Sequence, residues 1–143
     1  MQFKECYQNP FIEERADPYI TLGPDGFYYF TASYPMKSAD DKDGYDRVIL
    51  RRAKDISELA SAEEITIWKV ADTTLTHRFI WAPELHYIAG RWYVFYAGSE
   101  DKENNWAFDC HVLVCDSNDP YTGTWSEKGK FQKREEDDFS FTG

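Results

Sequence analysis

The sequence predicts an all-β fold made of two four-stranded units, which are the first two blades of a β-propeller. Aromatic residues make up 17% of the 143 residues, and such side chains suit the pleated surface of a sheet. The segment 17–32 (DPYITLGPDGFYYFTA) matches 82–97 (APELHYIAGRWYVFYA) at an offset of 65 residues. Each copy contains a glycine turn typical of a β-hairpin. Repeated four-stranded units are the building blocks of propellers.

Blade one is expected over about residues 10–70. Two strands flank the turn GPDG at 23–26, and RVILRRA at 47–53 is apolar enough for a buried third strand. ITIWKV at 65–70 is the expected fourth strand. The segment DISELASAEE at 55–64 is the one place where the sequence indicates a helical turn.

Blade two is expected over about residues 75–135 and repeats this order. Its hairpin turn is IAGR at 88–91, its third strand lies in HVLVCDSND at 111–119, and its fourth lies in GTWSEKGKF at 123–131. The final run, KREEDDFSFTG, is expected to open a third blade. Because propellers need about four to eight blades to close, we expect these residues to be the N-terminal portion of a longer catalytic domain. The alternative is a small two-sheet domain, whose sheet edges and apolar faces would be exposed.

Composition restricts the partners. The net charge of −10 disfavours nucleic acid, which needs a basic face. No apolar run reaches the length of a membrane span. Three cysteines (Cys6, Cys110 and Cys115) and an N-terminus without an apolar leader favour a cytoplasmic location.

Asp17 is the first candidate functional residue because it breaks the repeat. It stands opposite Ala82 in the second unit, so the architecture does not need a carboxylate there. The innermost strand of each blade lines the central channel, and paired carboxylates facing a pocket are the machinery of glycoside hydrolysis. The alternative for Asp17 is a turn cap before Pro18.

Three further residues are candidates at the same channel mouth. Trp81 could provide a flat platform for a sugar ring or pack in the core, and Tyr34 could reach the same mouth. Glu84 is a candidate second carboxylate, although an ion pair with Arg78 or Arg91 is the favoured interpretation. The histidines lack the spacing of a metal site, and the acidic loop at 38–46 lacks the ligand pattern of a calcium loop.

The segments NPFIEERADPYI, GFYYFTAS and FIWAPELHYIAGRWYVFYA together resemble glycoside hydrolase family 43, which contains α-L-arabinofuranosidases, β-xylosidases and arabinanases. The resemblance covers nearly the whole chain and is nearest to the arabinofuranosidase type. It implies a five-bladed β-propeller, an inverting mechanism, and an arabinose- or xylose-containing oligosaccharide as partner. It also implies that Asp17 is the general base and that Trp81 and Tyr34 line the sugar subsite.

The same resemblance implies a second Asp that tunes the acid, a general acid Glu, and a calcium ion in the channel held with a His. These would all belong to later blades, so no cofactor is expected within these residues and the chain alone should be inactive. Two other functions are compatible with a single visible acid. One is a carbohydrate-binding module, and the other is a structural propeller piece that associates with itself through its open sheet edges.

Overall fold

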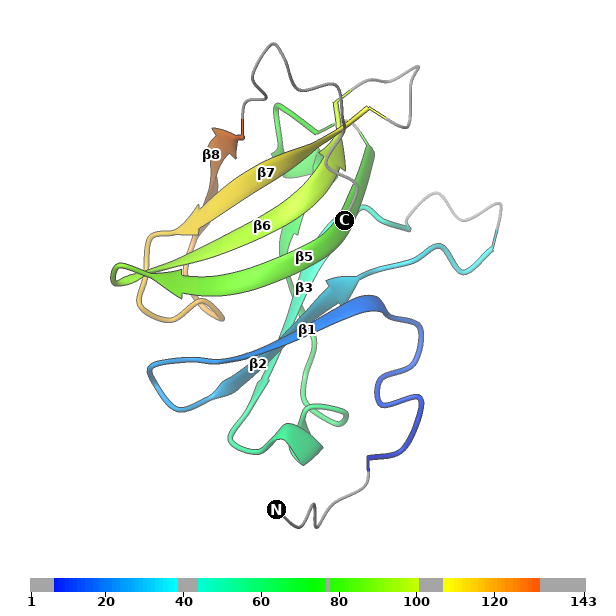
Figure 1. Ribbon diagram of the computed structural model, residues 1–143, viewed down its shortest axis with the longest axis vertical. Helices are drawn as coiled ribbons and strands as arrows, with labels where there is room; N and C mark the ends of the chain where they lie inside the picture. Colours follow the sequence, from blue (N-terminus) through cyan, green and yellow to red (C-terminus); the bar gives the residue numbers. More distant parts are fainter. Residues whose placement is uncertain (1–6, 39–43, 77, 101–106, 132–143) are drawn as a thin grey trace.

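The computed structural model describes residues 7–38, 44–76, 78–100 and 107–131, without the side chain of Arg78. Within these residues the chain forms two four-stranded sheets that lie one above the other in Figure 1. The expected start of a third blade, most of the acidic loop at 38–46 and the thiol of Cys6 lie outside the described residues.

The first sheet is an antiparallel meander of four consecutive strands. These strands are β1 (Ala16–Leu22), β2 (Tyr28–Ser33), β3 (Arg47–Ala53) and β4 (Ile65–Lys69). The expected helical segment forms one 3-10 turn, η1 (Ile56–Glu58), which the Asp55 side chain caps by accepting a hydrogen bond from the Ser57 amide. A second such turn, η2 (Val70–Asp72), follows β4.

The second sheet repeats this meander. Its strands are β5 (Arg78–Ile88), β6 (Arg91–Ser99), β7 (Phe108–Cys115) and β8 (Trp125–Lys130). The prediction of an all-β fold with two four-stranded units, including both fourth strands, is confirmed. In Figure 1 the innermost strands β1 and β5 lie next to each other.

The two hairpins differ in length by one residue, which corrects the alignment of the repeat. Ile20 pairs with Phe30, and the matching Leu85 pairs with Val94. The second strands therefore correspond at an offset of 64, not 65. Because a slip of one residue moves a side chain to the opposite face of a sheet, the offset of 65 matched similar residues that face different neighbours.

The main core lies between the sheets. Buried side chains from both sheets form one cluster, in which the rings of Tyr29 and Trp92 meet edge to face with centroids 5.1 Å apart. Its members are Tyr29, Val48, Leu50, Trp68, Ile80, Leu85, Trp92, Val94, Tyr96, Leu113, Cys115 and Trp125. Burial of this apolar area is the dominant force that fixes one sheet on the other. Polar contacts also join the sheets. Among them, Arg52 pairs with Asp119 at 2.9 Å, and the Tyr121 hydroxyl donates to the Glu63 carbonyl at 3.0 Å.

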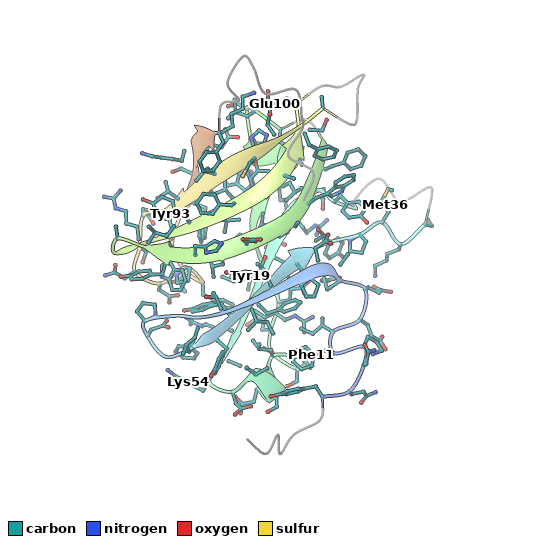
Figure 2. All side chains as sticks on the ribbon, viewed as in Figure 1. Phe11, Tyr19, Met36, Lys54, Tyr93 and Glu100 are labelled. Carbon is teal, nitrogen blue, oxygen red and sulfur yellow. The ribbon has the colours of Figure 1, made fainter. Side chains whose placement is uncertain are left out.

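The two outward-facing sheet surfaces differ. On the first sheet, Phe30, Ile49 and Leu59 are buried beneath the N-terminal residues Phe11 and Ile12. On the second sheet, a band of side chains is only half-buried, among them Tyr93, Phe95, Val112 and Val114, and Figure 2 labels Tyr93.

No helix among the described residues is long and apolar enough to cross a membrane.

Candidate active site

The same irregularity occurs in the innermost strand of each sheet. The pairing of β1 with β2 shifts between Ala16 and Tyr19, and the pairing of β5 with β6 shifts between Trp81 and Glu84. Each shift adds one unpaired residue to the inner strand, which defines a β-bulge. Asp17 and Ala82 lie in these bulges with φ of 50° and 44°, a left-handed conformation that is uncommon for residues other than glycine.

Asp17 presents its carboxylate at the surface of this bulge. The Ser33 hydroxyl donates a hydrogen bond of 2.8 Å to Asp17 Oδ2, and it accepts a hydrogen bond of 2.8 Å from the Ala82 amide. A single buried hydroxyl therefore connects the carboxylate of the first blade with the bulge of the second. Since bulges often re-aim a side chain next to an active site, this geometry is compatible with a functional role for Asp17.

Trp81 directly precedes Ala82 and is half-buried. Its indole stacks on Phe108 with ring centroids 4.2 Å apart, and Phe79 and Tyr45 lie at 5.3 and 5.7 Å. The bulge thus places an anchored aromatic ring one residue from the amide that contacts Ser33. Its role in sugar binding stays a prediction.

Tyr34 follows Ser33, but its ring has other neighbours. The guanidinium groups of Arg15 and Arg47 lie over the ring at 4.3 and 4.5 Å from its centroid. Arg15 is in turn held by Glu64. Cation–π contacts of this kind stabilise local packing, so the structure gives Tyr34 a packing role. Its expected sugar contact stays a prediction.

Glu84 pairs with a histidine. Its Oε2 lies 2.9 Å from Nε2 of His86, whereas the sequence favoured Arg78 or Arg91, and the Arg78 side chain is outside the description. Nδ1 of the same imidazole lies 3.5 Å from the hydroxyl of Tyr19 on β1. Figure 2 labels Tyr19 where β1 faces β5. Burial, and secondly the nearby Glu84 carboxylate, raise the pKa of Tyr19, which keeps this hydroxyl protonated.

The described residues contain no group of three or more His, Cys, Asp or Glu side chains arranged to hold a metal ion. The calcium ion that the resemblance implies would be held with a His of a later blade, so the residues described here do not test it.

Ser33 is the residue that sequence reasoning missed. Ala16 pairs with Ser33 in the first blade, and the matching Trp81 pairs with Ala97 in the second. Ser33 therefore corresponds to Ala97, just as Asp17 corresponds to Ala82. Both members of the Asp–Ser pair are thus alanine in the second blade. This joint difference between the repeats can be seen in the sequence, but only when the second strands are aligned at the offset of 64.

The sequence model described as "Glycosyl hydrolases family 43" matches residues 7–141. The chain belongs to this family. Two curated relatives are each named "Extracellular exo-alpha-(1->5)-L-arabinofuranosidase" and are 43% identical over 87% of this chain. They come from Streptomyces avermitilis and Streptomyces chartreusis, and the chain covers 24% and 35% of their lengths. "Alpha-L-arabinofuranosidase 43" of Humicola insolens is 42% identical over 88% of this chain.

Two solved structures are similar to this chain. The crystal structure of the α-L-arabinofuranosidase from Lactobacillus brevis matches with a TM-score of 0.74 and 39% identity, over 88% of this chain and 39% of the other. A GH43_1 enzyme from Xanthomonas citri complexed with xylose matches with a TM-score of 0.62 and 21% identity, over 79% and 32% of the two chains. The second likeness supports the fold alone. The chain thus spans about a quarter to two fifths of the length of these relatives.

The two Streptomyces relatives correct one expectation. A cytoplasmic location was predicted, but two relatives are named extracellular enzymes, and this prediction is wrong. The cysteine count was a poor guide for a physical reason. Cys110 and Cys115 are free thiols, and burial is the first cause that raises the pKa of both. Thiols held in the neutral form react slowly, so they do not report the redox state of the compartment.

Proposed function

We propose that this chain is the N-terminal part of an inverting glycoside hydrolase that removes terminal α-L-arabinofuranosyl residues from plant cell-wall polysaccharides or oligosaccharides. Membership of family 43 and arabinofuranosidase names at 39–43% identity support the reaction class and the sugar. The xylose complex is a weaker guide to substrate at 21% identity, so β-xylosides are the second choice. By the same reasoning the protein works outside the cell, as the names of two relatives state for those enzymes.

The observation that carries the proposal is the placement of Asp17. Its exposed carboxylate projects from a β-bulge on the innermost strand, and one oxygen is bound by Ser33. The second blade has the same bulge with Ala82 in its place. The fold therefore builds this bulge without needing a carboxylate, and the acidic side chain is free to serve chemistry.

In the proposed mechanism Asp17 is the general base. An inverting hydrolase activates a water on one face of the sugar with a carboxylate, and a carboxylic acid protonates the leaving oxygen on the other face. The two carboxyl groups stand about 6.5–9.5 Å apart so that the water fits between substrate and base. Asp17 takes the proton from the water through the oxygen that Ser33 does not bind. The general acid and the Asp that tunes it belong to later blades, as the family resemblance implies.

The other candidates take supporting roles in this proposal. Trp81, anchored by Phe108, offers its indole to the sugar ring. Tyr34 shapes the mouth from its position beneath Arg15 and Arg47. Glu84 is assigned to structure rather than to proton transfer, because its carboxylate is paired with His86.

The test is Asp17→Asn in a complete enzyme that contains these residues, assayed with an aryl α-L-arabinofuranoside and an aryl β-xyloside. We expect kcat to fall by about 10²–10⁴-fold, the usual contribution of a general base, while affinity for an arabino-oligosaccharide is retained. Glu58→Gln removes an exposed carboxylate on η1 and serves as the matched control. Normal turnover in Asp17→Asn would refute the assignment, and preferred cleavage of the xyloside would refute the choice of sugar.

A further inference from the structure

Ser33 occupies a fully buried position at the end of β2, with none of its surface exposed. Its hydroxyl makes two hydrogen bonds of 2.8 Å, one to Asp17 Oδ2 and one to the amide nitrogen of Ala82. A serine hydroxyl has one proton to donate and two lone pairs to accept with. A backbone amide can only donate, so the Ala82 N–H occupies a lone pair. The single hydroxyl proton is thereby directed at the Asp17 carboxylate.

This arrangement fixes which oxygen of Asp17 is engaged. Oδ2 is bound by Ser33, whereas Oδ1 has no hydrogen-bond partner among the described residues, and Asp17 as a whole is exposed. Within the described part of the chain, Ser33 is the hydrogen-bond partner of this carboxylate. An exposed aspartate without such a bond would exchange freely among rotamers. A buried hydroxyl anchored to the opposite blade restricts this motion.

The second blade shows that the fold does not require this pair. The positions matching Asp17 and Ser33 are Ala82 and Ala97, and the bulge is present there with the same left-handed backbone. Ala97 is also nearly buried, at 7% exposure. An alanine at the Ser33 position therefore has a precedent within this chain. A hydroxyl that is dispensable for the bulge, yet aimed at the carboxylate, has a role that the architecture does not explain.

We propose that Ser33 is a positioning residue for Asp17. By coupling the carboxylate to the Ala82 amide across the two blades, it holds Oδ2 and presents Oδ1 to the attacking water. This inference rests on the proposed role of Asp17 as general base. Ser33 itself touches neither the sugar nor the water, so its influence passes entirely through Asp17.

The test compares rates in a complete enzyme that contains these residues, with an aryl α-L-arabinofuranoside as substrate. For Ser33→Ala we expect kcat to fall roughly 10- to 100-fold, the effect of losing one hydrogen bond to a charged group, with KM changed less than about twofold. In the Asp17→Asn background the same substitution should leave the residual rate unchanged, because the group it positions is already gone. An equal fold loss in both backgrounds would mean a purely structural effect and would overturn the proposal.

A second pair of variants keeps the test decisive if Ser33→Ala perturbs folding. Ser33→Thr and Ser33→Val have nearly the same shape and differ in the hydroxyl group. We expect the Thr variant to be at least about tenfold faster than the Val variant, the value of one such hydrogen bond; equal rates would overturn the role of Ser33. Failure of the proposed function is distinguishable, because Asp17→Asn would then keep a normal rate whatever stands at residue 33.

Discussion

Replacing Glu64 with Gln should destabilise the first blade and should do so only above acidic pH. Glu64 is 17% exposed at its side chain and joins two arginines. Its Oε2 accepts hydrogen bonds from Nε of Arg15 at 3.1 Å and Nε of Arg51 at 3.0 Å, and its Oε1 contacts Nη2 of Arg15. Arg15 in turn lies over Tyr34 at the start of β1. Glu64 thus stabilises the entry to the strand that carries Asp17.

The size of the effect follows from this partial burial. Breaking a fully buried ion pair costs about 3–5 kcal/mol, whereas an exposed pair contributes about 0–1 kcal/mol. Gln keeps the shape and one acceptor oxygen but loses the charge, so we expect a loss of about 2 kcal/mol in the free energy of unfolding at pH 7. With a urea dependence of about 2 kcal/mol per molar, the midpoint should fall by about 1 M.

The pH dependence gives a second check. Burial alone would raise the pKa of Glu64, but the hydrogen bonds from Arg15 and Arg51 outweigh it and hold the pKa below 4.5. A depressed folded pKa stabilises the protein above the unfolded value and loses this contribution as pH falls through the folded pKa. The difference between wild type and Glu64→Gln should therefore be full at pH 7 and shrink below about pH 4.5. Glu58→Gln should stay within about 0.5 kcal/mol of wild type. A Glu64→Gln midpoint equal to that control, or a difference independent of pH, would refute the reasoning.

Three further predictions concern other parts of the chain. Burial lowers the pKa of His111 below 6.5, although the Glu100 carboxylate opposes this. The contribution of His111 to stability should therefore be full above about pH 6.5 and should decline on acidification toward pH 5, by at most about 1.4 kcal/mol per pH unit. A urea midpoint that declines equally in the His111→Gln variant would contradict this. The substitution Arg52→Met removes the ion pair with Asp119 between the sheets. It should lower the free energy of unfolding by about 1 kcal/mol in low salt and by less in 1 M NaCl. A difference that does not depend on salt would exclude an ionic origin. In a complete enzyme, Trp81→Ala should weaken arabino-oligosaccharide binding roughly tenfold, or about 1.4 kcal/mol, as measured by calorimetry, and unchanged affinity would remove Trp81 from the subsite.

Much of the fold could be predicted from the sequence because its signals are local. The strands are rich in aromatic and β-branched residues, and the turns carry glycines such as Gly26 and Gly90. The register of the second strand could not be predicted as easily. Five residues separate Leu22 from Tyr28, but only four separate the matching pair, Tyr87 and Trp92. Similar residue types aligned without a gap at the offset of 65, although the turn glycines Gly26 and Gly90 stand at an offset of 64. The shorter turn changes which residues of the second strands correspond, and with them the face of the sheet that each side chain occupies.

The candidate site was predicted in part. Asp17 stood out because it breaks the repeat, and Trp81 because it adjoins the matching residue. The partners of these side chains could not be predicted, because strand pairing and side-chain direction decide which nearby groups meet, and spacing along the chain does not. Glu84 meets His86 on its own strand, whereas Asp17 meets Ser33 from the neighbouring strand. Ser33 has an ordinary residue type, and only three-dimensional pairing reveals that its hydroxyl lies between two bulges.

The paired bulges also suggest how this scaffold can change. The backbone has a positive φ at Ala82 as well as at Asp17. Both described blades therefore form the bulge on the innermost strand, whether or not that position carries a reactive side chain. The repeated backbone sets the position of the side chain on the bulge. The chemistry at that position depends on two side chains, one on the bulge and one on the adjoining strand. The substitutions Ala82→Asp and Ala97→Ser would use a bulge that the second blade already has. Moving a carboxylate from one blade to the other would therefore take two substitutions and no change of fold.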